Sequence, residues 1–331
     1  MRWCVTPTAP SWSCAIRKKG KREVMEEYSP KTILLATDGS EDGGLAAAAA
    51  VDLSNRTGAK LHAAHAWVPL PQLAYPGLVP GQYRPPNEER ARGMLDEQLG
   101  RIEQARGTLT EAHLVEGRPA DAILDLAARI GADLIVIGSR GLGSVKRLLV
   151  GSVSLGVVHH ADRPVLVVRG GSWPPVRVVI GEDLSEDARG AARVGIALGK
   201  LLKAETLLAH AYEGMPPHPE TLPRDDRELY ETMVKKYLAR AEPALEARAA
   251  ELEDAYGLRP RLRILEGESA TALSEVAEEG GGAGLLVVGS RGLGVGGRML
   301  LGSVSTKVLM AVSGPVLVCP REERDEGGRR P

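Results

Sequence analysis

Short apolar runs alternate with longer amphipathic stretches along most of this chain. In the first half, the strand-like runs cover residues 32–36, 60–67, 110–115, 133–137 and 164–168. The helix-like stretches cover residues 45–54, 88–106, 119–130 and 152–161, and a segment rich in Pro, Gly and Tyr at 69–86 predicts a long loop. This alternation predicts βαβ units and a parallel sheet covered on both faces. We therefore expect a doubly wound α/β domain with five parallel strands.

The same order of elements is repeated in the second half. Residues 31–41 align with residues 176–186 at an offset of 145, and residues 114–117 align with residues 264–267 at an offset of 150. The second unit has therefore gained a few residues between its second and third strands. We expect two tandem domains, at residues 29–170 and 175–320, followed by a charged tail at 321–331.

A leader at residues 1–28 precedes the first domain. Its basic cluster follows its apolar residues, which is the reverse of the order in a signal peptide. Arg22-Glu23-Val24 before Met25 could be a ribosome-binding site read as protein. We expect this leader to be disordered or to belong to an incorrectly assigned start, with translation beginning at Met25.

Composition narrows the class of protein. With 43% apolar residues, 26% charged residues and a net charge of -1, the chain can bury a core and has no charge excess for nucleic acid or an anionic membrane. Aromatic residues make up 3% and Phe is absent, so the core is expected to be Val, Leu, Ile and Ala. The three cysteines form no zinc set and fit a reducing cytoplasm.

A glycine motif occurs once in each half. Gly138-Ser-Arg-Gly-Leu-Gly143 recurs 151 residues later as Gly289-Ser-Arg-Gly-Leu-Gly294, and a Gly-Ser pair follows each copy. Glycines let backbone N–H groups approach a phosphate, and the helix that begins at the Gly-Ser pair favours an anion. Two copies favour a phosphate-binding loop over a tight turn in which Ser152 is only an N-cap. The candidate residues are Gly138, Gly141, Gly151 and Ser152, and Gly289, Gly292, Gly302 and Ser303.

Other residues are expected near these loops. Asp38 and Asp183 end the first strand of each half, where a carboxylate would face ribose hydroxyls, an adenine amino group or Mg²⁺, or would simply form a turn. Arg140 and Arg291 either contact the phosphates or point to solvent. Ala66 and Ala211 offer backbone groups and a small apolar wall, and the preceding histidines, His65 and His210, are expected in the core.

No catalytic or metal-binding arrangement emerges from the matched positions. No Ser/His/Asp, Cys/His or paired-carboxylate set can be assembled, and His159-His160 has no partner at metal spacing. Residues 195–201 resemble a Walker A loop but are one residue short and lie in a helical stretch. Residues 292–297 match Gly-x-Gly-x-x-Gly but follow the fourth strand, where a dinucleotide fingerprint is not expected.

Residues 29 to 320 resemble the universal stress protein family in its ATP-binding, tandem-domain form. The resemblance rests on Gly138-x2-Gly141-x9-Gly151-Ser152, on Asp38 and on the small residue Ala66 after a histidine. It implies a fold like that of adenine-nucleotide α-hydrolases and one adenine-nucleotide site per domain, for ATP with Mg²⁺. It also implies that the last strands, at 164–168 and 315–318, join the domains as an internal pseudo-dimer.

Three functions remain open after this comparison. The first is a cytoplasmic ATP-binding regulator of the stress response, able to form homo-oligomers but binding neither nucleic acid nor membrane. The second is a slow ATPase or phosphotransferase, and the third is a structural dimeric module with vacant sites. Glu182 adds a carboxylate beside Asp183 in the second copy, and Leu184 replaces Gly39. We therefore expect the second site to bind ATP more weakly, because like charges near phosphates repel.

Overall fold

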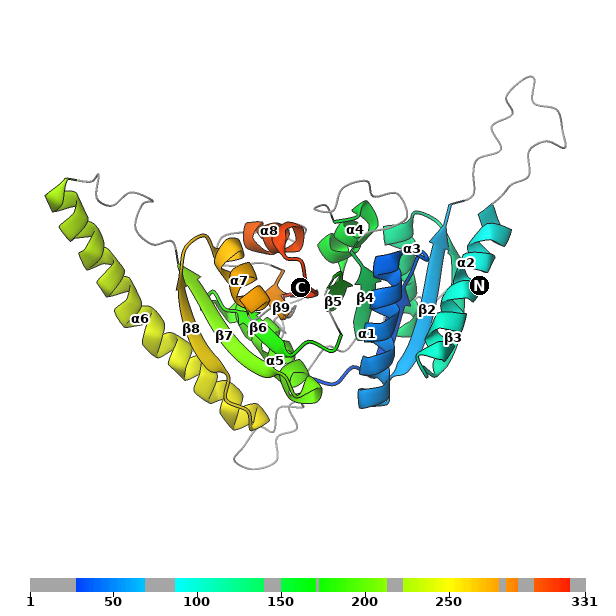
Figure 1. The fold of residues 1–331 in the computed structure, drawn as a ribbon, viewed down its shortest axis with the longest axis horizontal. Coiled ribbons are helices and arrows are strands. Elements are labelled where there is room, and N and C mark those ends of the chain that lie inside the picture. Colours follow the sequence, from blue (N-terminus) through cyan, green and yellow to red (C-terminus); the bar gives the residue numbers. More distant parts are fainter. Residues whose placement is uncertain are drawn as a thin grey trace, which may run out of the picture.

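A computed structural model of the chain describes residues 28–68, 87–139, 150–170, 173–212, 223–279, 284–290 and 301–321. Within these ranges, helices and strands alternate through two similar halves (Figure 1). The strands are β1 (Thr32–Ala36), β2 (Lys60–Trp67), β3 (Leu109–Glu116), β4 (Leu134–Gly138), β5 (Val165–Val168), β6 (Arg177–Gly181), β7 (Glu205–Tyr212), β8 (Arg261–Glu266), β9 (Leu285–Gly289) and β10 (Val316–Cys319). The helices are α1 (Glu41–Thr57), α2 (Asn87–Gln104), α3 (Pro119–Ile130), α4 (Ser152–His160), α5 (Glu186–Leu202), α6 (Arg224–Tyr256), α7 (Ser269–Glu278) and α8 (Ser303–Ala311). The tandem α/β architecture expected from the sequence is confirmed.

All the strands form one sheet in the order β3-β2-β1-β4-β5-β10-β9-β6-β7-β8. Within each half every pairing is parallel. In the first half β1 lies between β2 and β4, so the chain winds outward to one side through β2 and β3 and to the other side through β4 and β5. The reversal of strand order therefore falls between β1 and β4, as expected for a doubly wound sheet.

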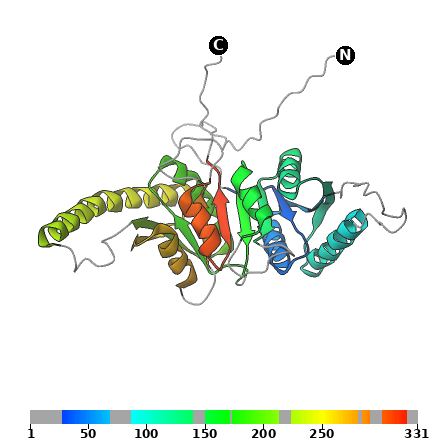
Figure 2. The same ribbon diagram turned by 90° about the horizontal axis from the view of Figure 1, so that it is seen from above.

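The two halves meet at their last strands. β5 and β10 pair antiparallel, with Val167 opposite Val316 and Val165 opposite Val318 (Figure 2). Every residue of both strands is buried. On the α1 side, the Trp173 indole donates a hydrogen bond of 2.9 Å to the carboxylate of Asp52. One continuous sheet with a shared apolar seam therefore joins the halves.

Each face of the sheet has its own apolar core. One core lies beneath α1, α2, α5 and α6, and the other lies beneath α3, α4, α7 and α8. Both are built mainly from Val, Leu, Ile and Ala, and the first core also contains Tyr256 and Cys319. The core composition expected from a chain without Phe is thus confirmed, because small aliphatic side chains fill the space between parallel strands and Ala-rich helices.

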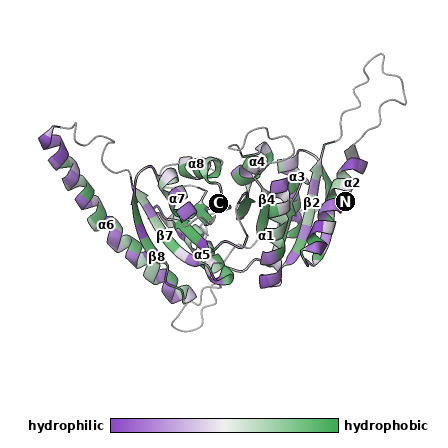
Figure 3. Cartoon of the chain, viewed as in Figure 1, coloured by the Kyte–Doolittle hydropathy of each residue, from purple (hydrophilic) through white to green (hydrophobic). Residues whose placement is uncertain are grey.

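The longest helix, α6, is the main difference between the halves. It has 33 residues, whereas its counterpart α2 has 18. Buried Leu95 and Ile102 of α2 correspond to buried Leu245 and Leu252 of α6 at an offset of 150, so only the C-terminal part of α6 matches α2. Residues 224–236 extend the helix past the sheet, and hydrophilic residues line much of its length (Figure 3). No helix in the described ranges is long and apolar enough to cross a membrane.

The end of β4 lies directly against the backbone of α1. A Cβ atom added to Gly138 would stand 2.8 Å from the carbonyl carbon of Asp42 and 2.8 Å from the nitrogen of Gly43. Backbone atoms cannot move aside as a flexible side chain would. We expected Gly138 to let a phosphate approach, but the close contact present in the fold is that between β4 and α1.

We expect Gly138→Ala to lower the free energy of unfolding by about 1–3 kcal/mol, because the added methyl group forces β4 and α1 apart. Gly93→Ala is the control, since Gly93 is exposed in α2 and has no atom within 4 Å of an added Cβ. That change should raise the free energy of unfolding by up to about 1 kcal/mol. Urea unfolding followed by circular dichroism measures both, and equal stability of Gly138→Ala and the parent chain would contradict the close approach.

Candidate functional site

Asp38 lies in a tight turn that joins β1 to α1. Its carboxylate accepts a 3.1 Å hydrogen bond from the Ser40 N–H, and the Ser40 hydroxyl in turn accepts one of 3.1 Å from the Gly43 N–H. Ser40 is thereby the N-cap of α1. Gly39 takes a left-handed φ of +82°, which glycine adopts without strain. The turn fixes Asp38 at the exit of the strand.

The second half repeats this turn with a different residue at its tightest point. Asp183 accepts hydrogen bonds from the N–H of Ser185 at 3.0 Å and from its hydroxyl at 2.5 Å. Leu184 occupies the position of Gly39 with a φ of +64°. A left-handed conformation costs a residue with a Cβ about 1–2 kcal/mol, so this half keeps the turn at an energetic cost.

The candidate residues of the first half gather at one edge of the sheet. Ala36 is in register with Ala64 of β2 and with Ile137 of β4. Asp38, Ala66 and Ser139 each lie two positions beyond these partners, so they share the carboxyl edge within about 10 Å across three strands. In the second half, Asp183, Ala211 and Gly289 lie at the corresponding edge of β6, β7 and β9.

The two parts of the glycine motif meet in space. The Gly151 N–H donates to the Ser139 carbonyl at 2.6 Å, and the Ser154 hydroxyl donates to the Gly138 carbonyl at 2.7 Å. The second half repeats both contacts, from Gly302 to Ser290 at 2.7 Å and from Ser305 to Gly289 at 2.6 Å. The intervening candidates Arg140, Gly141, Arg291 and Gly292 lie outside the described residues.

Helices α4 and α8 begin without a side-chain cap. Gly151 and Gly302 are the N-caps, and neither helix has a side-chain capping bond or an acidic residue in its first turn. Every other helix of the described ranges has one or the other. Ser152 and Ser303 are the first helical residues, so Ser152 is not the N-cap that the simple-turn alternative required. An anion is favoured at such a helix start, because the positive end of the helix dipole lies there.

His65 and His210 are core residues, as expected. Both are buried, and each ring donates its Nδ1 proton to a backbone carbonyl, that of Thr37 at 2.8 Å and that of Glu182 at 2.7 Å. The His210 Nε2 accepts a hydrogen bond from the Tyr237 hydroxyl of α6 at 2.5 Å. The Nδ1 contacts link β2 and β7 to the residues that follow β1 and β6, which are the candidate turns.

Glu182 does not lie free beside the candidate nucleotide. Its side chain is fully buried, and one carboxylate oxygen contacts the Arg248 guanidinium of α6 at 2.7 Å. The other accepts the Leu184 N–H at 2.8 Å. Burial raises the pKa of Glu182 to about 7, although Arg248 opposes the shift. The expected repulsion between Glu182 and phosphates is therefore wrong, because a buried cation balances this carboxylate.

The first half carries a neutral pair at the same two positions. Thr37 corresponds to Glu182, and Gln98 of α2 corresponds to Arg248 at the offset of 150. Gln98 is fully buried, and its amide atoms have no hydrogen-bond partner in the described part of the chain. Sequence reasoning missed both pairs because their members lie on separate elements. Alignment of α2 with α6 would have indicated these pairs, because both positions are neutral in the first half and both are charged in the second.

The model of the universal stress protein family matches residues 30–169 and 176–320. A universal stress protein of Thermus aquaticus is 44% identical over 140 residues, covering 42% of this chain and 98% of its own length. One of Mycobacterium tuberculosis is 34% identical over 139 residues, and the match covers 41% of this chain but only 43% of that relative. A solved universal stress protein of Archaeoglobus fulgidus shares the fold, with 22% identity, a TM-score of 0.59 and coverage of 89% of this chain and 100% of that one.

We expect Arg248→Gln to destabilise the chain by about 3–5 kcal/mol at about pH 9, since it leaves a buried carboxylate without its cation. A pKa raised above the ordinary value means that the folded state holds the proton more tightly, so this group favours folding at low pH and loses that effect as the pH rises through about 7. The loss caused by Arg248→Gln should therefore be smaller at about pH 5, where Glu182 is protonated.

The control is the double variant Glu182→Thr/Arg248→Gln, which installs the residue types of the first half. Its stability loss should depend little on pH. Urea unfolding at the two pH values measures both variants. An equal loss for Arg248→Gln at both would show that Glu182 carries no raised pKa.

Proposed function

The chain belongs to the universal stress protein family, and from this premise we propose that it is a cytoplasmic ATP-binding regulatory protein with one adenine-nucleotide site in each domain. The nucleotide state would alter how the protein associates with partners under stress. We further propose that the two domains act as an internal pseudo-dimer held by the β5–β10 pair.

The observation that carries this proposal is the pair of uncapped helix starts at Gly151 and Gly302. Both glycines have a φ of −64°, a conformation open to any residue, so the backbone does not require glycine there. Ser, Thr, Asp or Asn at an N-cap would stabilise the helix by about 1 kcal/mol. Both copies forgo this stabilisation. A bound phosphate group would supply the missing acceptor and would need the space that a side chain would fill.

The residues of each edge fit the parts of an adenine nucleotide. Gly138, Gly141, Gly151 and Ser152 would hold the phosphates with Arg140, while Asp38 would face the ribose, the adenine amino group or Mg²⁺, and Ala66 would leave room for the base. The second set is Gly289, Gly292, Gly302 and Ser303 with Arg291, Asp183 and Ala211. When bound, ATP with Mg²⁺ would supply a charged phosphate chain to this edge of the sheet.

A regulatory role is favoured over a slow ATPase or phosphotransferase by the state of the nearest histidines. His65 and His210 are buried, and the Nε2 of His210 already accepts the Tyr237 hydroxyl, so we expect neither ring to take a proton from water. Incubation of the purified chain with ATP separates the alternatives. Bound ATP without phosphate release over hours supports the regulator, release supports an enzyme, and failure to bind any nucleotide supports a structural module.

We expect Gly151→Asp to raise stability by about 1 kcal/mol and to weaken ATP binding at the first site by about tenfold or more, because the new carboxylate caps α4 and repels the phosphates. Gly151→Asn is the matched control, since it caps the helix without a charge and should weaken binding less. Calorimetric titration with ATP and thermal unfolding measure the two effects. Unchanged affinity in Gly151→Asp would exclude phosphate binding at α4.

Gly302→Asp makes the same change at the second site and leaves the first one to be measured alone. We expect the first site, measured in Gly302→Asp, to bind ATP more tightly than the second site, measured in Gly151→Asp. The physical reason is now the bulk of Leu184 where the first site has Gly39. Equal affinities in the two variants would exclude this asymmetry.

A further inference from the structure

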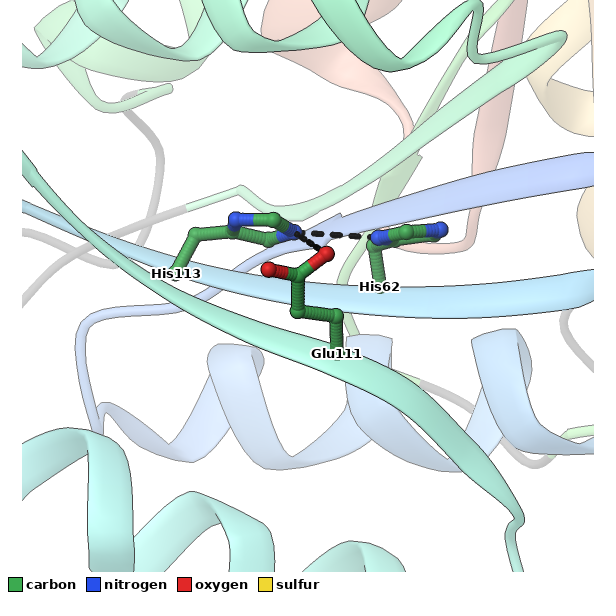
Figure 4. A group of neighbouring side chains, drawn as sticks. All are labelled: His62, Glu111 and His113. Atoms are coloured by element: carbon green, nitrogen blue, oxygen red, sulfur yellow. Dashed lines mark hydrogen bonds and ion pairs between the residues drawn. The ribbon is translucent and has the colours of Figure 1, made fainter.

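Two histidines and a glutamate meet on the outer strands of the first domain. His62 lies on β2, and Glu111 and His113 lie on β3 (Figure 4). The His62 Nδ1 and the His113 Nε2 are 3.0 Å apart, and the His113 Nε2 is 3.8 Å from a carboxylate oxygen of Glu111. One ligand atom from each residue lies within 4.8 Å of the other two. In Figure 4 the contacts from His62 and from Glu111 meet at the His113 Nε2.

The register of the two strands produces this convergence. His62 is opposite Glu111, and the register shifts by one residue between Leu61 and His62, so that Thr110 is the extra residue on β3. Glu111 and His113 are two apart and therefore share a face of the strand. Without the shift, the partner of His62 would be Thr110, which offers no comparable ligand. The irregularity thus brings a carboxylate to the imidazoles.

The protonation of the two imidazoles decides whether they can bind a metal ion. Their close nitrogens require that at most one of them carries a proton between the rings, so the pair is not doubly charged. Burial lowers the pKa of His62, and the neighbouring His113 and Lys60 lower it further, against the effect of Glu111. Burial also lowers the pKa of His113, with a further contribution from Arg129 and opposition from Glu111. Neutral imidazole and an ionised carboxylate are the forms that coordinate a divalent cation.

We propose that His62, Glu111 and His113 bind one Zn²⁺ ion that links the edge strand β3 to β2. Ligands about 2.0–2.1 Å from a tetrahedral zinc ion lie about 3.3–3.4 Å from one another. This value falls between the 3.0 Å that separates the two imidazole nitrogens and the 3.8 Å that separates the His113 Nε2 from Glu111. His62 is buried, His113 is half-buried and Glu111 is exposed, so the ion would be reached from solvent on the glutamate side. Three protein ligands leave a fourth position for water.

The second domain holds the same pair of strands by other means. Its counterparts of His62, Glu111 and His113 are Leu207, Arg261 and Arg263. Arg261 contacts Glu205 at 2.5 Å, and Arg263 contacts Glu279 at 3.0 Å, so salt bridges surround the matching position. Two cations and a leucine cannot bind zinc. The matching position in the second domain therefore serves as a negative control. One ion per chain is expected from this cluster.

The cluster is separate from the candidate nucleotide site. His62 stands near the start of β2, four residues before Ala66, which is about 13 Å along a strand. The proposal therefore does not depend on nucleotide binding, and its experiment is carried out without nucleotide.

The test is titration of the metal-free full chain with ZnCl₂ by calorimetry and with CoCl₂ by visible absorption, which reports the geometry of the ligands around cobalt. We expect the parent chain to bind one Zn²⁺ ion. The variants His62→Leu and His113→Arg carry the residue types of the second domain, and their affinity for this ion should fall about tenfold or more. His160→Ala changes an exposed histidine outside the cluster and should leave binding unchanged.

Thermal unfolding with and without zinc guards against misfolded variants, because zinc should raise the melting temperature of the parent chain and of His160→Ala but not of the two cluster variants. The proposal is overturned if the parent chain binds no zinc at concentrations up to about 0.1 mM. It is equally overturned if His62→Leu and His113→Arg bind zinc with the stoichiometry and affinity of the parent.

Discussion

The direct packing of the α1 backbone on the end of β4, at Gly138, is the constraint on which the candidate site depends. It holds the turn of Asp38 and the exit of β4 at one edge of the sheet. Buried Asp42 of α1 accepts the Ser139 hydroxyl at 2.8 Å, and the Ser139 carbonyl accepts the N–H of Gly151, where α4 begins. The protein's own hydrogen bonds thus join three elements at this edge of the sheet, so the described parts of the candidate site are held in place without a ligand.

The two halves keep this edge alike and differ behind it. Both copies have a glycine N-cap at the helix that follows the loop and an aspartate in the turn after the first strand. The interior beneath that turn is neutral in the first half, with Thr37 and Gln98, and ionic in the second, with Glu182 and Arg248. The outer strands carry a His-Glu-His cluster in one half and arginine salt bridges in the other. The two halves have therefore diverged more in the buried residues beneath the turn and in the outer strands than in the glycine and aspartate positions of the edge.

The sequence predicted the elements well because parallel strands buried on both faces leave uninterrupted apolar runs, and helices leave a clear period. It could also predict that Asp38 and Gly138 share an edge, since the order of a doubly wound sheet follows from its connections. The sequence wrongly predicted that Glu182 repels the phosphates of the nucleotide. The cation that balances this carboxylate, Arg248, lies 66 residues away on α6. The His62 cluster was missed because its alignment requires the register shift beside Leu61, which no periodicity reveals.

The proposed function requires that the paired glycine loops bind adenine nucleotides. The most direct measurement is the identity and amount of nucleotide released from freshly purified, undialysed protein, determined by liquid chromatography and mass spectrometry. We expect an adenine nucleotide in an amount between one and two equivalents per chain. Protein that carries no nucleotide, and that takes up none from added ATP at about millimolar concentration, would contradict the claim.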